Sequence, residues 1–282
     1  MIYTINSDNL SVGVRKKGAE ICSVKLNDRE FLWQGDSSFW SGQSPLLFPL
    51  VGPMHSEKIG GMKSDMKNHG FLKEMEFDLI EQSGNHIILE AVQNQDTLKL
   101  YPFKFRILAK FKVNGKTLES FYTVINEQSK EMVYSFGLHP AFYCNDTNFE
   151  DYYIEFPENK TIRRCRFEET GVSFENTDLV CENQKQIVFN RDMFSKTVII
   201  NDIDFNEIKY SNTKEGELFS FSFSGFNIFS MWQPQNAPFV CLEPWRGYNG
   251  LSNHTENVEE NLSVKFLKGN ESDVYSMTIS FV

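Results

Sequence analysis

Phe103-Lys-Phe-Arg-Ile-Leu-Ala-Lys-Phe-Lys-Val113, followed by Asn114-Gly115, is the stretch that decides the fold class. Apolar residues occupy every second position from Phe103 to Val113, and charged residues fill most positions between them. Successive side chains of a strand point to opposite faces, so this pattern predicts a strand with one buried and one exposed face. The Asn-Gly pair predicts a hairpin with a type I′ turn, which requires positive φ angles.

The same alternation recurs toward both ends of the chain. It is found at 219–224 and 275–281, and a shorter run starts at Leu10. Turn-forming residues separate such runs at strand-like intervals, as at Asn27-Asp28 and Ser83-Gly84-Asn85. Sustained 3.6-residue periodicity is absent from the sequence, and we expect only a short helical turn near Asp192. These patterns predict one all-β domain of antiparallel strands over residues 1–282, built as a sandwich.

Composition and charge narrow the classes of function. The net charge is −10 and no Lys/Arg-rich run occurs, which argues against a nucleic acid or an anionic membrane as partner. A neutral small molecule is compatible with this charge. Five scattered cysteines without a C-x-x-C pair indicate reduced thiols. The N-terminus has no signal-peptide pattern and no 18-residue apolar run occurs, so we expect a cytoplasmic protein without a membrane span.

Three segments interrupt the alternation and bring Pro and Gly next to His or Glu. They are 44–53 together with 68–71, then 136–142, and finally 238–245. His69 and His139 stand in apolar contexts, where a histidine is often a satisfied structural residue. Glu243 is the one carboxylate in an apolar run and must find a partner or shift its pKa, because burying an unpaired charge is costly. An ion pair with Arg246 is the structural alternative.

Taken as a set, these residues suit acid/base chemistry on a sugar. Opening a cyclic hemiacetal needs a base for the anomeric hydroxyl and an acid for the ring oxygen, and a Glu and a His with tuned pKa values supply both. We expect Glu243 and His139 to flank one sugar ring, with their side chains roughly 5–8 Å apart. The residues are far apart in sequence, so only the fold could assemble them.

The interrupted segments resemble the aldose 1-epimerase (galactose mutarotase-like) superfamily, in particular its LacX-like branch. The similar stretches occur in the family's order and cover roughly residues 30–250: Phe31-Leu-Trp-Gln-Gly35, Ser44-Pro-Leu-Leu-Phe-Pro-Leu-Val-Gly52, His69-Gly-Phe-Leu-Lys-Glu-Met-Glu-Phe77, Gly137-Leu-His-Pro-Ala-Phe142 and Ala237-Pro-Phe-Val-Cys-Leu-Glu-Pro-Trp245. The resemblance implies a β-supersandwich with an open sugar cleft. It also implies an isomerase that interconverts the α and β anomers of an aldose and needs no metal or cofactor. We expect a monomer or a weak homodimer.

The resemblance assigns roles to individual positions. His139 matches the histidine that protonates the ring oxygen, and Glu243 matches the glutamate that takes the proton of the C1 hydroxyl. His69 matches the histidine that binds and orients the sugar. Trp245 is expected to stack on a pyranose face, and Lys73 and Arg246 are expected to bind substrate.

The sequence departs from the family's pattern at three places. LacX-like sequences usually carry an arginine shortly before the Pro-x-Leu-Phe-Pro stretch and often another after the following Val-Gly, where this chain has Gly42-Gln43 and Pro53-Met54. Lys73 stands where the family often has Arg. Losing a bidentate donor weakens recognition of hydroxyl or phosphate groups, and Arg246 is a candidate substitute.

Three other classes of function compete with the epimerase. A non-catalytic carbohydrate-binding protein would keep the cleft and lose turnover, which the missing arginines favour. A glycoside hydrolase would need a second carboxylate beside Glu243. A metalloenzyme could use His69, His139 and Glu243 as ligands, although the chain has no G-x-G-x-x-G, P-loop or H-E-x-x-H motif.

Overall fold

The computed structural model of the chain describes residues 1–54, 58–144 and 149–282. Strands dominate, and the pairings between them are antiparallel, which confirms the predicted all-β class. Helical structure in these residues is limited to one α-helix and four 3₁₀ turns: α1 (Gln95–Leu100), η1 (Leu72–Glu74), η2 (Phe149–Asp151), η3 (Asp192–Ser195) and η4 (Val258–Glu260). The turn expected near Asp192 is η3. No helix in the described ranges is long and apolar enough to cross a bilayer.

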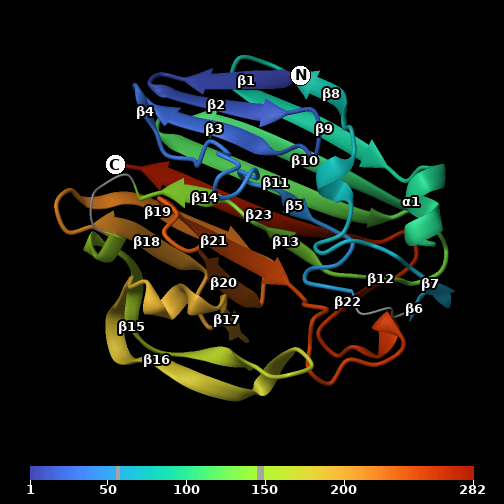
Figure 1. Cartoon of the computed structure of the whole chain (residues 1–282). Coiled ribbons are helices and arrows are strands. Elements are labelled where there is room, and N and C mark those ends of the chain that lie inside the picture. Colours follow the sequence, from blue (N-terminus) through green and yellow to red (C-terminus); the bar gives the residue numbers. More distant parts are fainter. Residues whose placement is uncertain (55–57, 145–148) are drawn as a thin grey trace.

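A nine-stranded sheet forms the back layer (Figure 1). Its strands, in spatial order, are β16 (Val172–Val188), β15 (Tyr152–Phe167), β18 (Glu207–Asn212), β19 (Gly216–Ser224), β23 (Ser272–Phe281), β11 (Thr117–Asn126), β10 (Phe105–Asn114), β9 (His86–Val92) and β8 (Asp78–Gln82). The three longest alternating segments, 103–113, 219–224 and 275–281, form strands of this sheet, the first of them from Phe105 onward. Their apolar side chains are buried on one face, as predicted.

Smaller sheets form the front layer. A six-stranded sheet contains β17 (Val198–Asn201), β20 (Ile228–Trp232), β21 (Phe239–Arg246), β13 (Phe136–Leu138) and β5 (Leu46–Leu47), with β14 (Ala141–Tyr143) also on β21. A four-stranded sheet contains β1 (Ile2–Ser7), β2 (Leu10–Arg15), β3 (Ile21–Leu26) and β4 (Arg29–Glu30). Two short pairs complete the layer: β12 (Met132–Tyr134) with β22 (Lys265–Leu267), and β6 (Lys58–Ile59) with β7 (Met62–Lys63).

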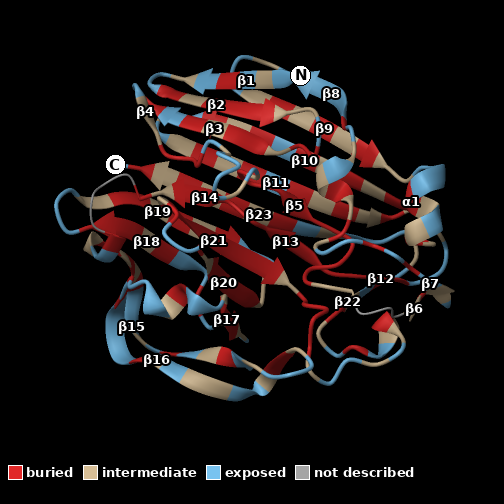
Figure 2. Cartoon of the chain, viewed as in Figure 1, coloured by how far each residue is buried: buried red, intermediate tan, exposed pale blue. Residues whose placement is uncertain are grey.

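Aromatic side chains fill the space between the two layers. Phe142 of β14 packs on Phe219 of β19 with ring centroids 4.6 Å apart, and Phe229 of β20 stacks on Phe223 at 5.5 Å. Figure 2 shows the buried positions following the strands of both layers, while the β15–β16 hairpin is exposed over much of its length. The sandwich core therefore joins the two layers, and the front sheet presents its other face to the cleft described below.

The turns lie where the sequence predicted them, but one of them is of a different type. The turns at 27–28 and 83–85 separate β3 from β4 and β8 from β9, as expected. The β10–β11 hairpin also forms, with Asn114 paired to Thr117. Only Gly115 has a positive φ there, at 55°, so the predicted type I′ turn is wrong. The loop is Gly115-Lys116, one residue later than the Asn-Gly pair suggested, because β10 extends through Asn114.

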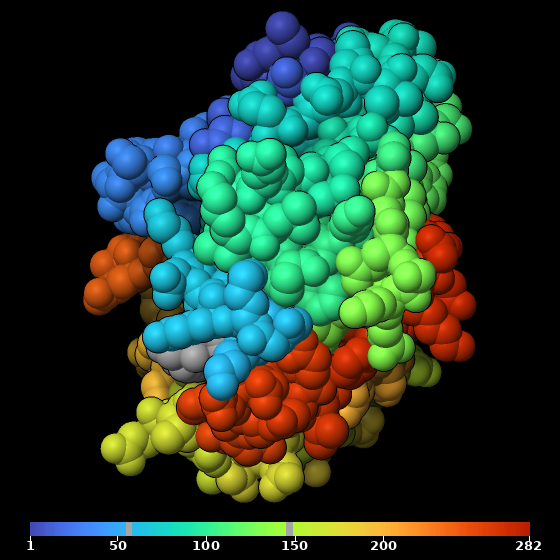
Figure 3. All heavy atoms as spheres, turned by 90° about the vertical axis from the view of Figure 1, so that its right-hand side faces the viewer, coloured from blue at the N-terminus to red at the C-terminus, as the bar shows by residue number. Residues whose placement is uncertain are grey.

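Segments distant in sequence close one side of the molecule. In the view of Figure 3, residues near 60–67 lie against residues near 255–262. The backbone N–H of Lys58 donates to the carbonyl of Glu256 at 2.7 Å, which ties the first segment to the second. This packing holds the chain that continues from β7 toward His69, and so it supports one wall of the cleft.

Candidate active site

The strand register sets His139 opposite Glu243. Gly137 of β13 pairs with Trp245, and Ala141 of β14 pairs with Cys241. Continuing the register by two residues from either pair places His139 across from Glu243. Pro140, which has no N–H to offer a ladder, separates β13 from β14, and its carbonyl accepts from the Leu242 N–H at 3.1 Å. Pro140 thus interrupts the edge where the histidine meets the carboxylate.

The two side chains are in direct contact and almost fully buried. Nε2 of His139 lies 3.2 Å from Oε2 of Glu243, closer than the 5–8 Å expected from a sugar ring between them. The exposed fractions are 8% for His139 and 1% for Glu243. Neither carboxylate oxygen of Glu243 nor Nδ1 of His139 has a hydrogen-bond partner within the described part of the chain. Buried polar atoms in folded proteins normally have hydrogen-bond partners. Because these three atoms have none, they are available to a ligand.

Burial shifts the pKa values of Glu243 and His139 in the directions that favour their uncharged forms. It raises the pKa of Glu243 well above its usual value, and the nearby Trp245 indole offsets part of this rise without reaching hydrogen-bond geometry. Burial lowers the pKa of His139 well below 6.5, and His69 and Lys73 lower it further. A carboxylate with a raised pKa is a stronger base, and an imidazolium with a lowered pKa is a stronger acid.

His69 is held in a left-handed backbone conformation. Its φ is 65°, which is uncommon for a residue with a side chain, and Gly70 follows with φ 71°. A Cβ on Gly70 would lie 2.1 Å from the Phe48 carbonyl oxygen, so only glycine allows this close approach. Strained conformations of this kind cluster at functional sites.

Hydrogen bonds to Gly52 set the tautomer of His69. The His69 N–H donates to the Gly52 carbonyl at 3.1 Å, and the Gly52 N–H donates to Nδ1 of the His69 ring at 3.1 Å. Nδ1 is therefore an acceptor, and the ring proton of the neutral form resides on Nε2. Burial, with a smaller effect of Lys73, lowers the pKa of His69 to about 4, so the ring is neutral at pH 7. His69 thus offers an N–H donor 5.8 Å, ring centre to ring centre, from His139.

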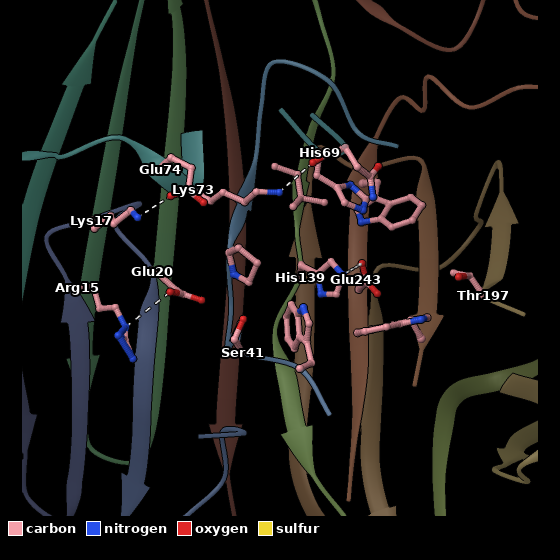
Figure 4. Close-up of a pocket in the computed structure, with 17 residues that line it drawn as sticks. Arg15, Lys17, Glu20, Ser41, His69, Lys73, Glu74, His139, Thr197 and Glu243 are labelled. Carbon is pink, nitrogen blue, oxygen red and sulfur yellow. Dashed lines mark hydrogen bonds and ion pairs between the residues drawn. The ribbon is translucent and has the colours of Figure 1, made fainter. Parts of the chain in front are cut away.

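These residues line one cleft of about 720 Å³ (Figure 4). His69, His139, Glu243, Trp245 and Lys73 all contribute to its walls, so five of the six residues expected from the sequence are brought together. Lys73 belongs to η1, and its ammonium donates to the Asn68 carbonyl at 2.9 Å. Its remaining donors have no carboxylate partner in the described ranges. A volume of this size accommodates a small polar ligand such as a sugar.

Comparisons with known proteins identify the family of this chain. The family model for aldose 1-epimerase matches residues 1–265. The chromosomal LacX protein of Lactococcus lactis subsp. lactis is 30% identical over 263 residues, which is 88% of each chain. The chain belongs to the aldose 1-epimerase family. The galactose mutarotase related enzyme of Lactobacillus acidophilus has a TM-score of 0.92 at 24% identity, covering 100% of this chain and 97% of that one. A galactose mutarotase-like protein of Lactobacillus casei ATCC 334 has a TM-score of 0.90 at 24% identity, with both chains fully covered.

One departure from the aldose 1-epimerase pattern, Gly42, has a structural reason. A Cβ on Gly42 would lie 2.4 Å from the ring of Trp40. The Trp40 ring in turn stacks on His139, with centroids 4.9 Å apart and planes 30° apart. A larger residue at position 42 would displace this ring. Trp40 was not among the residues expected from the sequence, although its place two residues before Gly42 in the cleft segment was a visible signal.

Trp232 was also missed, and it contacts the same histidine. Its ring meets His139 edge-on at 5.7 Å and Trp40 at 5.5 Å. Both tryptophans are half-buried and line the cleft. Trp245, the expected stacking residue, is 3% exposed, and Tyr248 stacks on its ring at 5.7 Å. Trp40 and Trp232 therefore present more aromatic surface to a ligand than Trp245 does.

Charged residues that the sequence did not single out form the other end of the cleft. Arg15 of β2 contacts Gln43 through a guanidinium hydrogen bond and lies 3.7 Å from Glu20. Glu20 also accepts from the N–H groups of Gln43 and Ser44. Arg15 thus brings a guanidinium beside Gly42-Gln43, where LacX-like sequences usually have an arginine in the chain itself. The other pair, Lys17 and Glu74, is joined at 2.5 Å.

Arg246 is not brought to this cleft. It ends β21, one residue beyond Trp245, and lines a separate hollow of about 570 Å³ with Asn227 and Phe174. Side chains alternate along a strand, so Arg246 points away from the face that carries Glu243 and Trp245. The alternative reading of Glu243, as the ion-pair partner of Arg246, is wrong for the same reason.

The donor atoms that could hold a metal differ from the set considered from the sequence. Within the described residues, His139, Cys241 and Glu243 place one donor each within 4.8 Å of one another. His69 is not part of this group. The metal alternative therefore centres on a different third residue, Cys241.

Proposed function

We propose that this protein is a mutarotase, an aldose 1-epimerase that interconverts the α and β anomers of a small sugar by acid/base ring opening. The observation that carries the proposal is the contact between His139 and Glu243, two buried groups that lack other polar partners at the floor of a cleft. Membership of the aldose 1-epimerase family supports it. Fold alone would not, because one fold hosts many functions.

The proposed reaction begins with a sugar whose C1 hydroxyl faces Glu243 and whose ring oxygen faces His139. The Glu243 carboxylate accepts the hydroxyl proton, His139 gives a proton to the ring oxygen, and the bond between C1 and the ring oxygen breaks. The product is an open-chain aldehyde. Rotation about the C1–C2 bond turns the other face of the carbonyl to the returning hydroxyl, and the reverse proton transfers close the ring as the other anomer.

The direct contact between the two groups accounts for the starting protonation state. Burial favours a protonated Glu243 and a neutral His139, so the empty pair carries one proton. The active form, a carboxylate beside an imidazolium, carries the same single proton. Because the atoms are 3.2 Å apart, the proton can pass from one to the other when sugar hydroxyls donate to the carboxylate. A sugar then enters by separating the side chains of His139 and Glu243. Without a sugar between them, they are therefore closer together than the width of a sugar ring.

The surrounding residues are proposed to bind rather than to transfer protons. His69 donates its Nε2–H to a sugar oxygen, since its Nδ1 is occupied by Gly52. Lys73 offers its free donors to a hydroxyl or to an anionic substituent. Trp40 and Trp232 supply apolar surface for the C–H face of the ring, and Trp245 lies beside His69. No step calls on a metal or an organic cofactor.

Polarimetry on a panel of free and phosphorylated aldoses tests this proposal. The wild-type protein should accelerate the change in optical rotation of at least one aldose over the spontaneous rate. His139→Asn should lose at least about 100-fold of that acceleration, because proton-transfer groups contribute ~10²–10⁴-fold. A sugar methylated at the anomeric oxygen should still compete for the site. Binding without any acceleration by the wild type would instead assign the chain to the carbohydrate-binding proteins.

A further inference from the structure

A buried thiol lies beneath the proposed catalytic pair and has no part in the mechanism. Cys241 is on β21, two residues before Glu243, so its side chain lies on the same face of the strand. It is fully buried and not bonded to another cysteine. Its sulfur, one imidazole nitrogen of His139 and one carboxylate oxygen of Glu243 all lie within 4.8 Å of one another.

These three donors match the preferences of a thiophilic divalent cation. Zinc binds thiolate sulfur, imidazole nitrogen and carboxylate oxygen at about 2.0–2.3 Å. Magnesium and calcium prefer sets made of oxygen ligands alone, which this group does not offer. The donor set therefore selects for zinc-like ions and against the abundant hard cations.

The geometry is near that of a three-ligand zinc site. Tetrahedral bonds of this length separate neighbouring donor atoms by roughly 3.5 Å. The His139 nitrogen and the Glu243 oxygen are already 3.2 Å apart, and the thiol sulfur lies within 4.8 Å of a donor atom of each residue. His139 and Glu243 line the cleft, while Cys241 lies behind them, which leaves the fourth position open to the cleft.

An independent observation supports a ligand at this point. Both carboxylate oxygens of Glu243 lack hydrogen-bond partners, although Glu243 is only 1% exposed. A sugar would satisfy the carboxylate from the cleft side. It would not reach Cys241, which is not among the residues that line the cleft. Only a ligand small enough to sit between the three side chains uses all of them.

We propose that His139, Cys241 and Glu243 bind one thiophilic divalent cation, such as Zn²⁺, which blocks the sugar site. Binding breaks the S–H bond of Cys241 and the O–H bond of the protonated Glu243, and both protons leave to solvent as the thiolate and the carboxylate coordinate the metal. The bound cation occupies the lone pairs that would accept and return the protons of the sugar. The site is thus inhibitory. Its effect on turnover rests on the proposed function, whereas cation binding does not.

Cation binding is tested first, on the full chain and without any sugar. Equilibrium dialysis should find one Zn²⁺ per chain, and Mg²⁺ at the same concentration should not bind. Co²⁺ in place of Zn²⁺ should give the near-ultraviolet charge-transfer absorption of a cobalt–thiolate bond. Cys241→Ser and Cys241→Ala should each lose that absorption and at least about tenfold in affinity, since even residues that only orient metal ligands contribute ~10–100-fold.

Cys165→Ser is the matched control, because Cys165 is also a buried, unpaired cysteine but lies on β15 outside the cleft. It should bind cobalt with the wild-type spectrum. Thermal unfolding of each variant checks that it is folded. The wild-type spectrum is decisive by itself: a chain that binds no Co²⁺, or binds it without the thiolate absorption, overturns the proposal. So does an unchanged spectrum in a folded Cys241→Ser protein.

Inhibition is tested separately on the sugar that the polarimetric panel identifies. Zn²⁺ should suppress catalysed mutarotation by the wild type, and a chelator should restore it. Cys241→Ser should keep its basal rate and need at least about tenfold more Zn²⁺ for the same suppression, by the same ligand-loss argument. Equal sensitivity of the two proteins would overturn the inhibitory role. If the wild type turned over no sugar, the cobalt spectrum would still decide whether the cation site exists.

Discussion

The two ends of the cleft treat their polar groups in opposite ways. At the charged end, Lys17 is paired with Glu74, and Glu20 accepts two backbone N–H groups beside Arg15. At the aromatic end, Glu243 and His139 contact each other but have no hydrogen-bond partner for three of their buried polar atoms.

This difference indicates which polar groups of the cleft are available for chemistry and which are not. Paired and exposed charges are worth little individually, because solvent screens them and holding long side chains costs entropy. Burying a carboxylate without a partner costs folding free energy. Such groups therefore occur mainly at functional sites. We therefore expect substitutions at the aromatic end to change rate, and substitutions at the charged end to change little.

The largest effect is expected for Glu243→Gln. The amide keeps the shape and a hydrogen-bonding oxygen but cannot accept the C1 hydroxyl proton, so catalysed mutarotation should fall by ~10²–10⁴-fold. Sugar binding should stay within about tenfold, because the loss concerns proton transfer. The melting temperature should not fall, because burial already keeps Glu243 in its neutral form and the amide is likewise neutral. Full activity in the folded variant would remove Glu243 from the mechanism.

The next effect concerns stability and pH at His69. Its pKa is about 4 in the folded chain and 6.5 when unfolded, so the unfolded state binds more protons between these values. The contribution of His69 to the free energy of unfolding is fully present above pH 6.5 and is lost as the pH falls toward 4. Between pH 7 and pH 5 the loss should be about 2 kcal/mol. Glu243 acts in the opposite direction, because its raised pKa means that its contribution is lost as the pH rises.

His69→Asn isolates this contribution. Asparagine tolerates positive φ, and its side-chain oxygen can accept from the Gly52 N–H in place of Nδ1. Urea unfolding at pH 7 and pH 5, with chelator present, should show a smaller loss for the variant than for the wild type. Parallel pH dependence of the two proteins would show that His69 is not held neutral by burial.

A smaller, selective effect is expected for Lys73→Met. The ammonium is partly buried, has one backbone acceptor and faces the cleft, so its charge-assisted hydrogen bonds are available to a substrate. Such a bond to an anionic group contributes about 1.5–3 kcal/mol, so KM for a phosphorylated aldose should rise at least about tenfold. Lys17→Met, which removes an ammonium already paired with Glu74, is the control. Equal loss with free and phosphorylated aldoses would assign Lys73 to a sugar hydroxyl.

The smallest effect is expected for Glu74→Gln. The carboxylate lines the cleft but is exposed and paired with Lys17, and exposed ion pairs contribute about 0.2–1 kcal/mol. Its kcat/KM should stay within about threefold of wild type. A loss as large as that of Glu243→Gln would erase the contrast between the two ends of the cleft.

Much of the fold and part of the site were predictable from local patterns. Alternation in 103–113 predicted a strand of the back sheet, because burial of one face has a period of two residues. Motif resemblance brought His69, His139 and Glu243 together, and they do line one cleft. Trp40 could have been singled out by its place two residues before Gly42, but its stack on His139 could not be foreseen. Arg15 escaped notice because its reach from β2 to Gln43 leaves no sequence pattern.

By itself, the sequence determined the strand pattern, the family and the residue types available for acid/base chemistry. Only the tertiary structure decided which of them meet. It set His139 opposite Glu243 through the pairing of β13 and β14 with β21, and it turned Arg246 to the other face. It also placed the Cys241 thiol under the pair. The reason is physical: strand periodicity is local, whereas register, burial and the loss of hydrogen-bond partners depend on chains that pair across the whole molecule.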